Sequence, residues 1–357
     1  MTPLEPKPRP RVDTPADAAP IGWQREFAVA ITDPAELVAL LGLETQWIEP
    51  ARRAAQIFPL RVTHSYLARI RPGDPHDPLL RQVLPLGDEL RENPSFGADP
   101  VGESAYQRAP ALLQKYLGRA LLVTTGACAL HCRYCFRREF PYEAQQGETG
   151  RWREAVTTIA ADPSIRELIL SGGDPLSIGN ARLQALSREL IGIAHLDSLR
   201  LHTRNAIVLP SRVDQGFIDW IRSLPWRVTI VLHINHANEI EGDALEAIGR
   251  LRTTGALLLN QSVLLRGVND SVSALEALSR RLHAQGVLPY YLHLLDRVRG
   301  SAHFEVGEAT GIALIDALRD RMPGYLVPKL VREIPGRQSK TAIAGSPSTP
   351  TNDHLLA

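Results

Sequence analysis

Short apolar runs rich in β-forming residues recur along the last two thirds of the chain. Their starts lie roughly 30 to 45 residues apart, which is about the length of one βα unit. The runs occupy residues 120–125, 167–171, 199–203, 228–233, 257–263 and 289–294. This spacing predicts six strands, each followed by a segment that crosses back over the sheet.

Segments with helical periodicity alternate with these runs. They cover residues 152–161, 181–193, 213–223, 242–253 and 272–285, with another at 311–321. Strands that alternate with helices predict a parallel α/β architecture. A closed barrel needs eight such units, so six predict a partial, open (β/α)6 barrel with its active site at the carboxyl ends of the strands.

The first third of the chain has a different pattern. Its first residues hold many prolines and almost no apolar run, whereas helical patches follow at 34–43 and 47–55. A stretch rich in Gly, Ser and Pro lies close to the carboxyl end. We therefore predict a flexible arm, a helical extension, a barrel core and a flexible tail at residues 1–21, 22–108, 109–340 and 341–357.

Composition and charge exclude several classes of protein. Hydrophobic residues make up 44% and charged residues 22%, which is typical of a soluble globular protein. A net charge of +1 gives no electrostatic footprint for nucleic acid or anionic membrane. Neither a secretory signal nor an apolar run long enough to span a bilayer is present. We therefore expect a cytoplasmic protein without nucleic-acid or membrane partners.

All three cysteines follow the first predicted strand, in Gly126-Ala-Cys128-Ala-Leu-His-Cys132-Arg-Tyr-Cys135. Their number and crowding exclude a disulfide scaffold. Thiolates at C-x3-C-x2-C spacing can occupy three corners of a 4Fe-4S cluster and leave the fourth iron open. The alternatives are a zinc site, although the chain has no fourth cysteine and His131 would have to share the short loop, or three inert buried thiols.

This cysteine loop resembles that of the radical S-adenosylmethionine superfamily. The resemblance implies that the open iron chelates S-adenosylmethionine, whose reductive cleavage yields a carbon radical. The second strand ends in Ser171-Gly172-Gly173-Asp174, which is similar to the glycine-rich motif at the amino group of that cofactor. Such a sequence alone is more often only a turn. His233 resembles a residue near the cofactor, and the alternative is a core histidine.

Further motifs narrow the resemblance to the lysine 2,3-aminomutases, over residues 116–340. They are Cys135-Phe-Arg137-Arg138, His202-Thr-Arg204, His233-Ile-Asn-His236-Ala-Asn-Glu239, Asn260-Gln261 with its following residues to Asp270, and Pro289-Tyr-Tyr. These enzymes bind pyridoxal phosphate on a lysine near the carboxyl end of the core. The resemblance implies that Lys340 has this role, in Glu333-Ile-Pro-Gly-Arg-Gln-Ser-Lys340.

The scarcity of lysine supports this choice, because only four of the 40 basic residues are lysines. A Schiff base needs an amine that is held in a pocket and made less basic there. Lys7 lies in the predicted arm, Lys115 precedes the first predicted strand, and Lys329 has no polar neighbours in the sequence. Lys340 follows a polar, glycine-containing loop, and its alternative interpretation is a solvated surface charge.

The same resemblance implies roles for further residues around the cofactors. Tyr116 and Arg119 correspond to positions that pack against the pyridoxal ring and hold its phosphate. Lys115 is a weaker candidate beside these two residues, and Gln261 corresponds to another position at the phosphate. The expected cofactors are thus a 4Fe-4S cluster, S-adenosylmethionine and pyridoxal phosphate.

Three residues correspond to the substrate-binding positions of the family. Arg137 matches the arginine that pairs with the substrate carboxylate, a role suited to a guanidinium fork; the alternative is a surface arginine. Asp296 and Glu333 match two acids that receive the side-chain ammonium of lysine. A buried ammonium needs such partners, so the acid pair indicates a basic amino acid as substrate.

The chain departs from the family in two respects. The residues before Lys340 lack the usual run of glycines, and the further cysteines and longer tail of the zinc-bridged members are absent. This shorter pattern resembles bacterial enzymes that supply (R)-β-lysine for the modification of elongation factor P. We therefore predict isomerisation of L-α-lysine to (R)-β-lysine, an electron donor protein as partner, and a functional link to elongation factor P and its lysyl ligase. The alternatives are a radical aminomutase of glutamate or arginine, and a zinc-binding module without catalysis.

Overall fold

The computed structural model describes residues 22–142 and 151–344. The predicted arm at 1–21 and most of the predicted tail at 341–357 lie outside these ranges, and the predicted domain boundaries remain predictions. None of the helices in the described part of the chain combines the length and apolar character needed to cross a bilayer.

One sheet runs through the molecule, with its ten described strands arranged in chain order from β1 to β10. All six predicted strands are confirmed, and each pairs in parallel with the next. They are β3 (Arg119–Thr125), β4 (Glu167–Gly172), β5 (Ser198–Thr203), β6 (Arg227–His233), β7 (Leu257–Val263) and β8 (Leu288–His293). Among the described residues no ladder joins β1 to β10, so the partial, open barrel is confirmed.

Four strands were not expected from the sequence. Two antiparallel strands, β1 (Gln107–Ala109) and β2 (Leu112–Tyr116), form one edge of the sheet beside β3. At the other edge β9 (Lys329–Arg332) pairs in parallel with β8, and β10 (Thr341–Ala342) pairs antiparallel with β9. These strands are short and partly polar, so they lack the apolar runs that marked the others. The parallel part of the sheet is therefore one strand wider than predicted.

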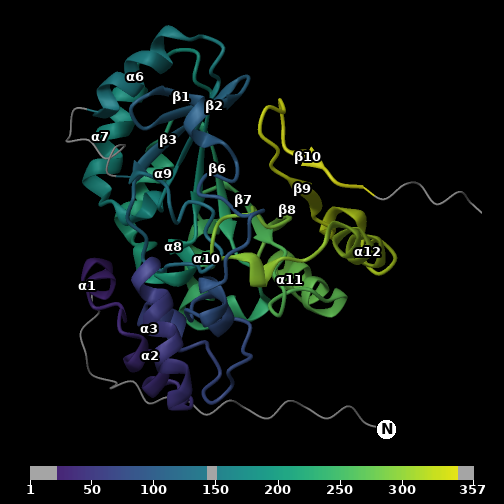
Figure 1. Cartoon of the computed structure of the whole chain (residues 1–357). Helices are drawn as coiled ribbons and strands as arrows, with labels where there is room; N and C mark the ends of the chain where they lie inside the picture. The colour runs from purple at the N-terminus through teal and green to yellow at the C-terminus, as the bar shows by residue number, and fades with distance from the viewer. Residues whose placement is uncertain (1–21, 143–150, 345–357) are drawn as a thin grey trace, which may run out of the picture.

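Helices follow the parallel strands at the predicted places (Figure 1). They are α6 (Arg151–Ala161), α7 (Asn180–Leu190), α9 (Gln215–Ser223), α10 (Gly242–Arg252), α11 (Val272–Ala284) and α12 (Glu308–Arg319), with a short α8 (Asn205–Val208) after β5. Polar caps fix two of their starts: the side chain of Asp214 accepts from the N–H of Phe217, and that of Ser271 from the N–H of Ala274.

The chain before β1 forms the predicted helical extension, which Figure 1 shows gathered at one end of the molecule. Its helices are α1 (Trp23–Ala28), α2 (Pro34–Leu40), α3 (Ile48–Ile57) and α4 (His64–Leu67). Short 3-10 turns complete the described chain at Thr45–Trp47, Leu80–Gln82, Gly87–Leu90, Glu103–Tyr106, Pro175–Ser177, Pro210–Arg212, Ala237–Glu239, Ala302–Phe304 and Gly324–Leu326.

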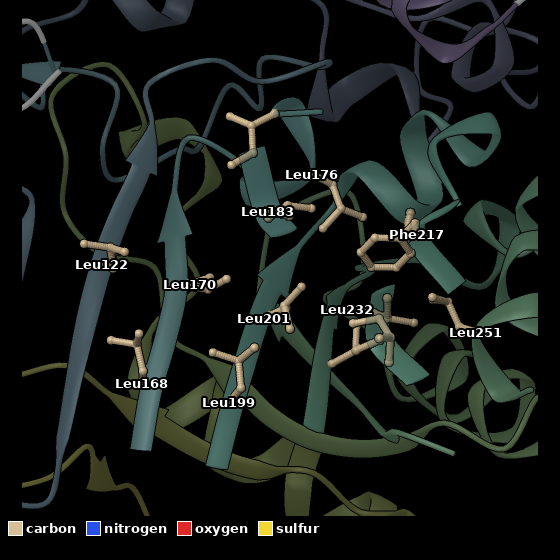
Figure 2. Packing of buried hydrophobic residues seen from close by; sticks show 14 of the residues in the cluster. Leu122, Leu168, Leu170, Leu176, Leu183, Leu199, Leu201, Phe217, Leu232 and Leu251 are labelled. Atoms are coloured by element: carbon tan, nitrogen blue, oxygen red, sulfur yellow. The ribbon is translucent and has the colours of Figure 1, made fainter. Parts of the chain in front are cut away.

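Alternation along the strands gives the sheet two different faces. Leucines of the outer face, such as Leu170 and Leu201, pack with helix residues such as Leu183, as Figure 2 shows. The residues between them point the other way because successive side chains of a strand alternate. This inner face carries mainly polar and aromatic side chains, among them Arg200, His202, Gln261, Tyr291 and His293. The sheet is thus built to enclose a polar site.

The extension packs directly against the loop that holds the cysteines. Ala129 and Leu130 of this loop belong to the same apolar cluster as Leu37 and Val62 of the extension. Glu89 adds a buried charge contact, since its carboxylate accepts hydrogen bonds from Arg133 at 2.7 and 2.8 Å. The extension therefore contributes to the position of the cysteine loop.

Candidate active site

A cavity of about 310 Å³ lies against the inner face of the sheet. The cysteine loop (residues 126–135), the strand ends and the segment after β9 all contribute to its wall. Every residue to which the sequence analysis gave a role lines it: Tyr116, Arg119, Cys128, Cys132, Cys135, Arg137, Ser171, Gly172, Gly173, Asp174, His233, Gln261, Asp296, Glu333 and Lys340. The structure thus brings all of these residues to one site, while their individual roles remain predictions.

The cavity runs along the sheet and is not confined to the carboxyl ends of the strands. Tyr116 and Arg119 flank the turn between β2 and β3, at the amino end of β3. The hydroxyl of Tyr116 nevertheless donates a hydrogen bond to Glu333, which follows the carboxyl end of β9. The curved sheet therefore brings the end of β9 back towards the start of β3. The expected location at the carboxyl ends holds only for the part of the site near the cysteine loop.

Two glycines at the end of β4 let the cysteine loop approach the sheet closely. A Cβ atom on Gly172 would lie 2.4 Å from the carbonyl oxygen of Thr125, and one on Gly173 would lie 2.5 Å from that of Ala127. Gly172 also has a φ of 121°, a backbone conformation that residues other than glycine rarely adopt. The two glycines therefore allow the end of β4 to pack against the start of the cysteine loop. This packing role is additional to the ligand contact that the sequence predicted for them.

The carboxylate of Asp174 is engaged within the protein. It accepts hydrogen bonds from the backbone N–H groups of Arg204 at 2.7 Å and Asn205 at 2.8 Å. The N–H of Leu176 and the hydroxyl of Thr203 each donate to it at 2.9 Å. Asp174 thus ties the end of β4 to the end of β5, and a ligand that contacts this side chain must share its oxygens.

Arg137 meets a carboxylate that the sequence analysis missed. Its Nε and Nη2 atoms donate to the two carboxylate oxygens of Glu103 at 2.7 and 2.6 Å, while Nη1 donates to Ser171 Oγ and to the carbonyl oxygen of Gly172, both at 3.0 Å. Burial lowers the pKa of Arg137, but the charge of Glu103 outweighs this effect and raises the pKa overall. Glu103 lies in a short 3-10 turn of the extension, where no motif distinguishes it from other surface acids.

Lys340 lies beside Glu333 in the loop between β9 and β10. The Nζ atoms of Lys340 and Lys115 each lie 2.9 Å from an oxygen of this carboxylate, which also accepts from Tyr116. Burial raises the pKa of Glu333, but the two ammonium groups and the tyrosine hydroxyl outweigh it and lower this pKa to about 2. Glu333 is therefore ionised at neutral pH. Lys340 also lies 5.8 Å from the ring centre of Tyr291.

The pKa of Asp296 is shifted in the opposite direction from that of Glu333. Burial raises its pKa to about 7, and the charge of Glu333 adds to this effect while Lys340 opposes it. Within the described residues no cation lies within ion-pair distance of the Asp296 carboxyl group. Of the two acids predicted to receive an ammonium group, Glu333 is thus already paired and Asp296 is not.

Three histidines of the inner face are held neutral by burial. Burial and the charge of Arg204 lower the pKa of His233 to about 3, and its Nε2 atom lies 3.0 Å from the hydroxyl of Tyr134. Burial also lowers the pKa of His202 and His293, whose Nε2 atoms have no hydrogen-bond partner in the described chain. Neutral imidazoles can donate or accept a hydrogen bond, and both of these residues line the cavity.

Comparison with known proteins identifies the family. Residues 117–193 match the model of a 4Fe-4S single cluster domain. An L-lysine 2,3-aminomutase of Escherichia coli strain K12 is 44% identical over 322 residues, covering 90% of this chain and 94% of its own. The chain belongs to the lysine 2,3-aminomutase family.

Two further matches have lower sequence identity to this chain. The L-lysine 2,3-aminomutase of Clostridium subterminale is 32% identical and covers 90% of this chain and 77% of its own. Among solved structures, a radical SAM methyltransferase from Sphaerobacter thermophilus aligns at 17% identity with a TM-score of 0.44, over 62% of this chain and 68% of its own.

Membership of the lysine 2,3-aminomutase family confirms the prediction of an isomerase of the radical S-adenosylmethionine class. It also implies the predicted cofactors, which are a 4Fe-4S cluster, S-adenosylmethionine and pyridoxal phosphate.

The cysteine loop fits the cluster that the lysine 2,3-aminomutase family implies. Its thiols form no disulfide, and all three line the cavity. Burial raises the pKa of Cys128, and it raises that of Cys135 to about 11, so both thiols stay protonated near neutral pH until a metal centre takes up the sulfur. Within the described ranges no three His, Cys, Asp or Glu side chains converge on a single ion. The thiolates of a cubane bind separate iron atoms, so they need not converge on one ion as the ligands of zinc do.

The other end of the cavity fits pyridoxal phosphate. The guanidinium of Arg119 lies 4.6 Å from the ring centre of Tyr116 and makes no hydrogen bond or ion pair with the rest of the described chain. An unpaired guanidinium beside an aromatic ring suits a phosphate attached to a flat heterocycle. Lys115 is less available, because its Nζ atom already contacts Glu333 and donates to the carbonyl oxygen of Val101 at 2.9 Å.

The glycine contact gives a first prediction for this aminomutase. Gly173→Ala should displace the cysteine loop, because the added methyl group meets backbone atoms that cannot move independently. We expect a loss of about 1–3 kcal/mol in the free energy of unfolding from this overpacking. The iron bound after anaerobic reconstitution should fall as well. Gly179→Ala is the matched control, since no atom lies within 4 Å of its Cβ position. Equal iron contents in both variants would contradict the close packing.

Proposed function

We propose that this protein converts L-α-lysine into (R)-β-lysine and supplies this product for the modification of elongation factor P. One observation carries the proposal: a single cavity has the three cysteines in one part of its wall and Lys340 in another, with Arg137 and Asp296 also lining it. An aminomutase that needs both a radical source and a pyridoxal group must hold the two close to one substrate.

The cofactors supply the radical and the conjugated ring across which nitrogen migrates. In our proposal the chain's own residues hold and orient these groups. Cys128, Cys132 and Cys135 hold the cluster, and Lys340 holds pyridoxal phosphate through its amine. Ser171, Gly172, Gly173, Asp174 and His233 form the S-adenosylmethionine site. Tyr116, Arg119 and Gln261 form the site for the pyridoxal ring and its phosphate.

The charges in the cavity suit an amino acid with a carboxylate at one end and an ammonium at the other. Arg137 receives the carboxylate. Nearly all of its donors are used within the chain, so the substrate carboxylate takes the place of Glu103 on the guanidinium. Asp296 and Glu333 receive the side-chain ammonium. Asp296 has no cationic partner among the described residues, so it can pair with this ammonium directly. Glutamate has no ammonium in this position, and arginine presents a wider, planar cation.

Apolar side chains also contribute to the wall around these polar groups. Leu113, Leu121, Ile169, Val263 and Leu295 belong to the wall of the cavity. A dry wall protects a carbon radical from side reactions, and it strengthens each ion pair that holds the substrate.

The electron for the cluster comes from outside the chain. All three cysteines are used by one cluster, which leaves no cysteine in the sequence for a second one. We therefore propose an electron donor protein as the partner of this enzyme.

The covalent site is tested by comparing two lysines. Reductive trapping with borohydride should fix pyridoxal phosphate on Lys340, as peptide mass spectrometry would show. Lys340→Ala should bind no trapped cofactor and should lose aminomutase activity, because Lys115, which also lines the cavity, is held by Glu333 and by the carbonyl oxygen of Val101. Lys329→Ala is the control, since this exposed residue is not part of the cavity wall. Trapped cofactor on the Lys340→Ala protein would place the covalent site elsewhere.

The raised pKa of Asp296 predicts how lysine binding depends on pH. Below about pH 7 this carboxyl group is protonated and cannot pair with an ammonium group, which itself stays charged throughout this range. The KM for lysine should therefore fall as the pH rises towards 7, by up to about tenfold per unit, and then level off. Asp296→Asn should raise this KM and remove its pH dependence. A KM that falls with pH in the same way in both proteins would contradict this role of Asp296.

The biological role is tested by the handedness and fate of the product. Chiral chromatography should show (R)-β-lysine, and the lysyl ligase of elongation factor P should attach this product to its protein substrate in a coupled assay. Chemically synthesised (R)-β-lysine and (S)-β-lysine serve as the positive and negative controls. An (S) product, or a product that the ligase does not use, would separate this enzyme from elongation factor P.

A further inference from the structure

A buried network of polar side chains surrounds the guanidinium of Arg204, and no role given above depends on it. The network joins the cysteine loop to the ends of β5 and β6, to the 3-10 turn Ala237–Glu239 and to the helical extension. Its members are at most 8% exposed: Tyr66, Gln82, Tyr134, Arg204, Asn235 and Glu239. Burying so many polar groups costs free energy unless each of them is hydrogen-bonded, so a functional reason for this network is worth seeking.

Arg204 is the centre of this network. Its Nη2 atom donates to Gln82 Oε1 at 2.7 Å and to Glu239 Oε2 at 3.1 Å. Its Nη1 atom contacts the hydroxyl of Tyr134 and lies 2.8 Å from Cys132 Sγ. Within residues 22–142 and 151–344, Cys132 is the one cysteine whose sulfur accepts a hydrogen bond from another side chain. The sulfur atoms of Cys128 and Cys135 have no side-chain donor in these ranges.

The partners of Arg204 are themselves fixed. Glu239 Oε1 accepts from the backbone N–H groups of Asn235 at 2.9 Å and His236 at 3.1 Å. Gln82 Nε2 donates to the carbonyl oxygen of Pro78 at 3.0 Å, and Asn235 Nδ2 donates to Gln82 Oε1 at 3.0 Å. The backbone N–H of Arg204 is held by Asp174. The guanidinium therefore cannot turn away from Cys132 without breaking several buried hydrogen bonds.

Hydrogen bonds and positive charge at the sulfur atoms of a cluster raise its reduction potential, because they stabilise the form that carries one more electron. We propose that Arg204 is a positioning residue for the cluster: it holds the sulfur of Cys132 and eases the uptake of one electron from the external donor. Glu239 moderates this effect, since its carboxylate offsets part of the guanidinium charge. The proposal rests on the assignment of Cys132 as a cluster ligand.

The test is a redox titration of the reconstituted full-length protein, followed by the electron paramagnetic resonance signal of the reduced cluster. Arg204→Gln removes the charge and should shift the midpoint potential to more negative values. Arg204→Lys keeps the charge and should restore part of the shift. Glu239→Gln removes the opposing charge and should shift the potential to more positive values.

Opposite shifts distinguish this role from general damage, because a disturbed fold would not change the potential in a direction that follows the charge. The matched control is Arg212→Gln. Arg212 is also buried, and it donates to the carbonyl oxygens of Leu176 at 2.7 Å and Ile178 at 3.0 Å, but it contacts no cysteine. This variant should keep the potential of the parent protein.

An unchanged potential in Arg204→Gln at full iron content would overturn the proposal. If this variant takes up no iron, Glu239→Gln decides, and an unchanged or more negative potential there would also overturn it. Failure of the cysteine assignment would look different, since the parent protein would then show no cluster signal to titrate.

Discussion

The parallel pairing of β3 to β9 is the constraint on which the rest of the structure depends. It places the segments that follow successive strands at the carboxyl ends of these strands. The cysteine loop, the glycine pair and Glu333 therefore line one cavity although they are far apart in the sequence. The alternation of side chains then separates an apolar outer face, packed against helices, from a polar inner face. A cavity that is buried and also rich in charged groups follows from these two features.

Charge compensation explains how a buried cavity can hold so many charged groups. Arg137 pairs with Glu103, Lys340 with Glu333, and Arg204 with Glu239. A buried charge without a partner costs several kcal/mol, so each pair removes a penalty that its two charges would otherwise carry. In the proposed function the first two pairs are rearranged when cofactor and substrate bind, whereas the third stays in place. Asp296 lacks a cationic partner among the described residues, and burial raises its pKa.

Much of the fold could be predicted because the six longest parallel strands carry apolar runs at regular spacing. The edge strands could not, since β1, β2, β9 and β10 are short and depend on neighbours for their pairing. Motifs brought out Cys128 and Lys340 because their residue types are scarce in this chain. Glu103 had no such signal: one acid among 39 becomes significant only when the fold sets it beside an arginine. Glu239 stands at the end of a quoted motif, but nothing in that motif pointed to Arg204 as its partner.

The glycine pair shows a different limit of the sequence. Its motif indicated a ligand site, but the structure shows that a side chain on either glycine would also meet the backbone of the cysteine loop. In the same way Asp174 belongs to the motif and is committed to the ends of β4 and β5. One sequence pattern here thus combines a predicted ligand contact with the packing of the cysteine loop against the sheet.

The most direct measurement is the identification of the product formed when the reduced, reconstituted protein is incubated anaerobically with lysine, S-adenosylmethionine and pyridoxal phosphate. Parallel incubations would replace lysine by glutamate or by arginine. The account predicts β-lysine from lysine and no β-amino acid from the other two. A β-amino acid formed from glutamate or arginine but not from lysine, by protein with its full iron and pyridoxal content, would contradict it.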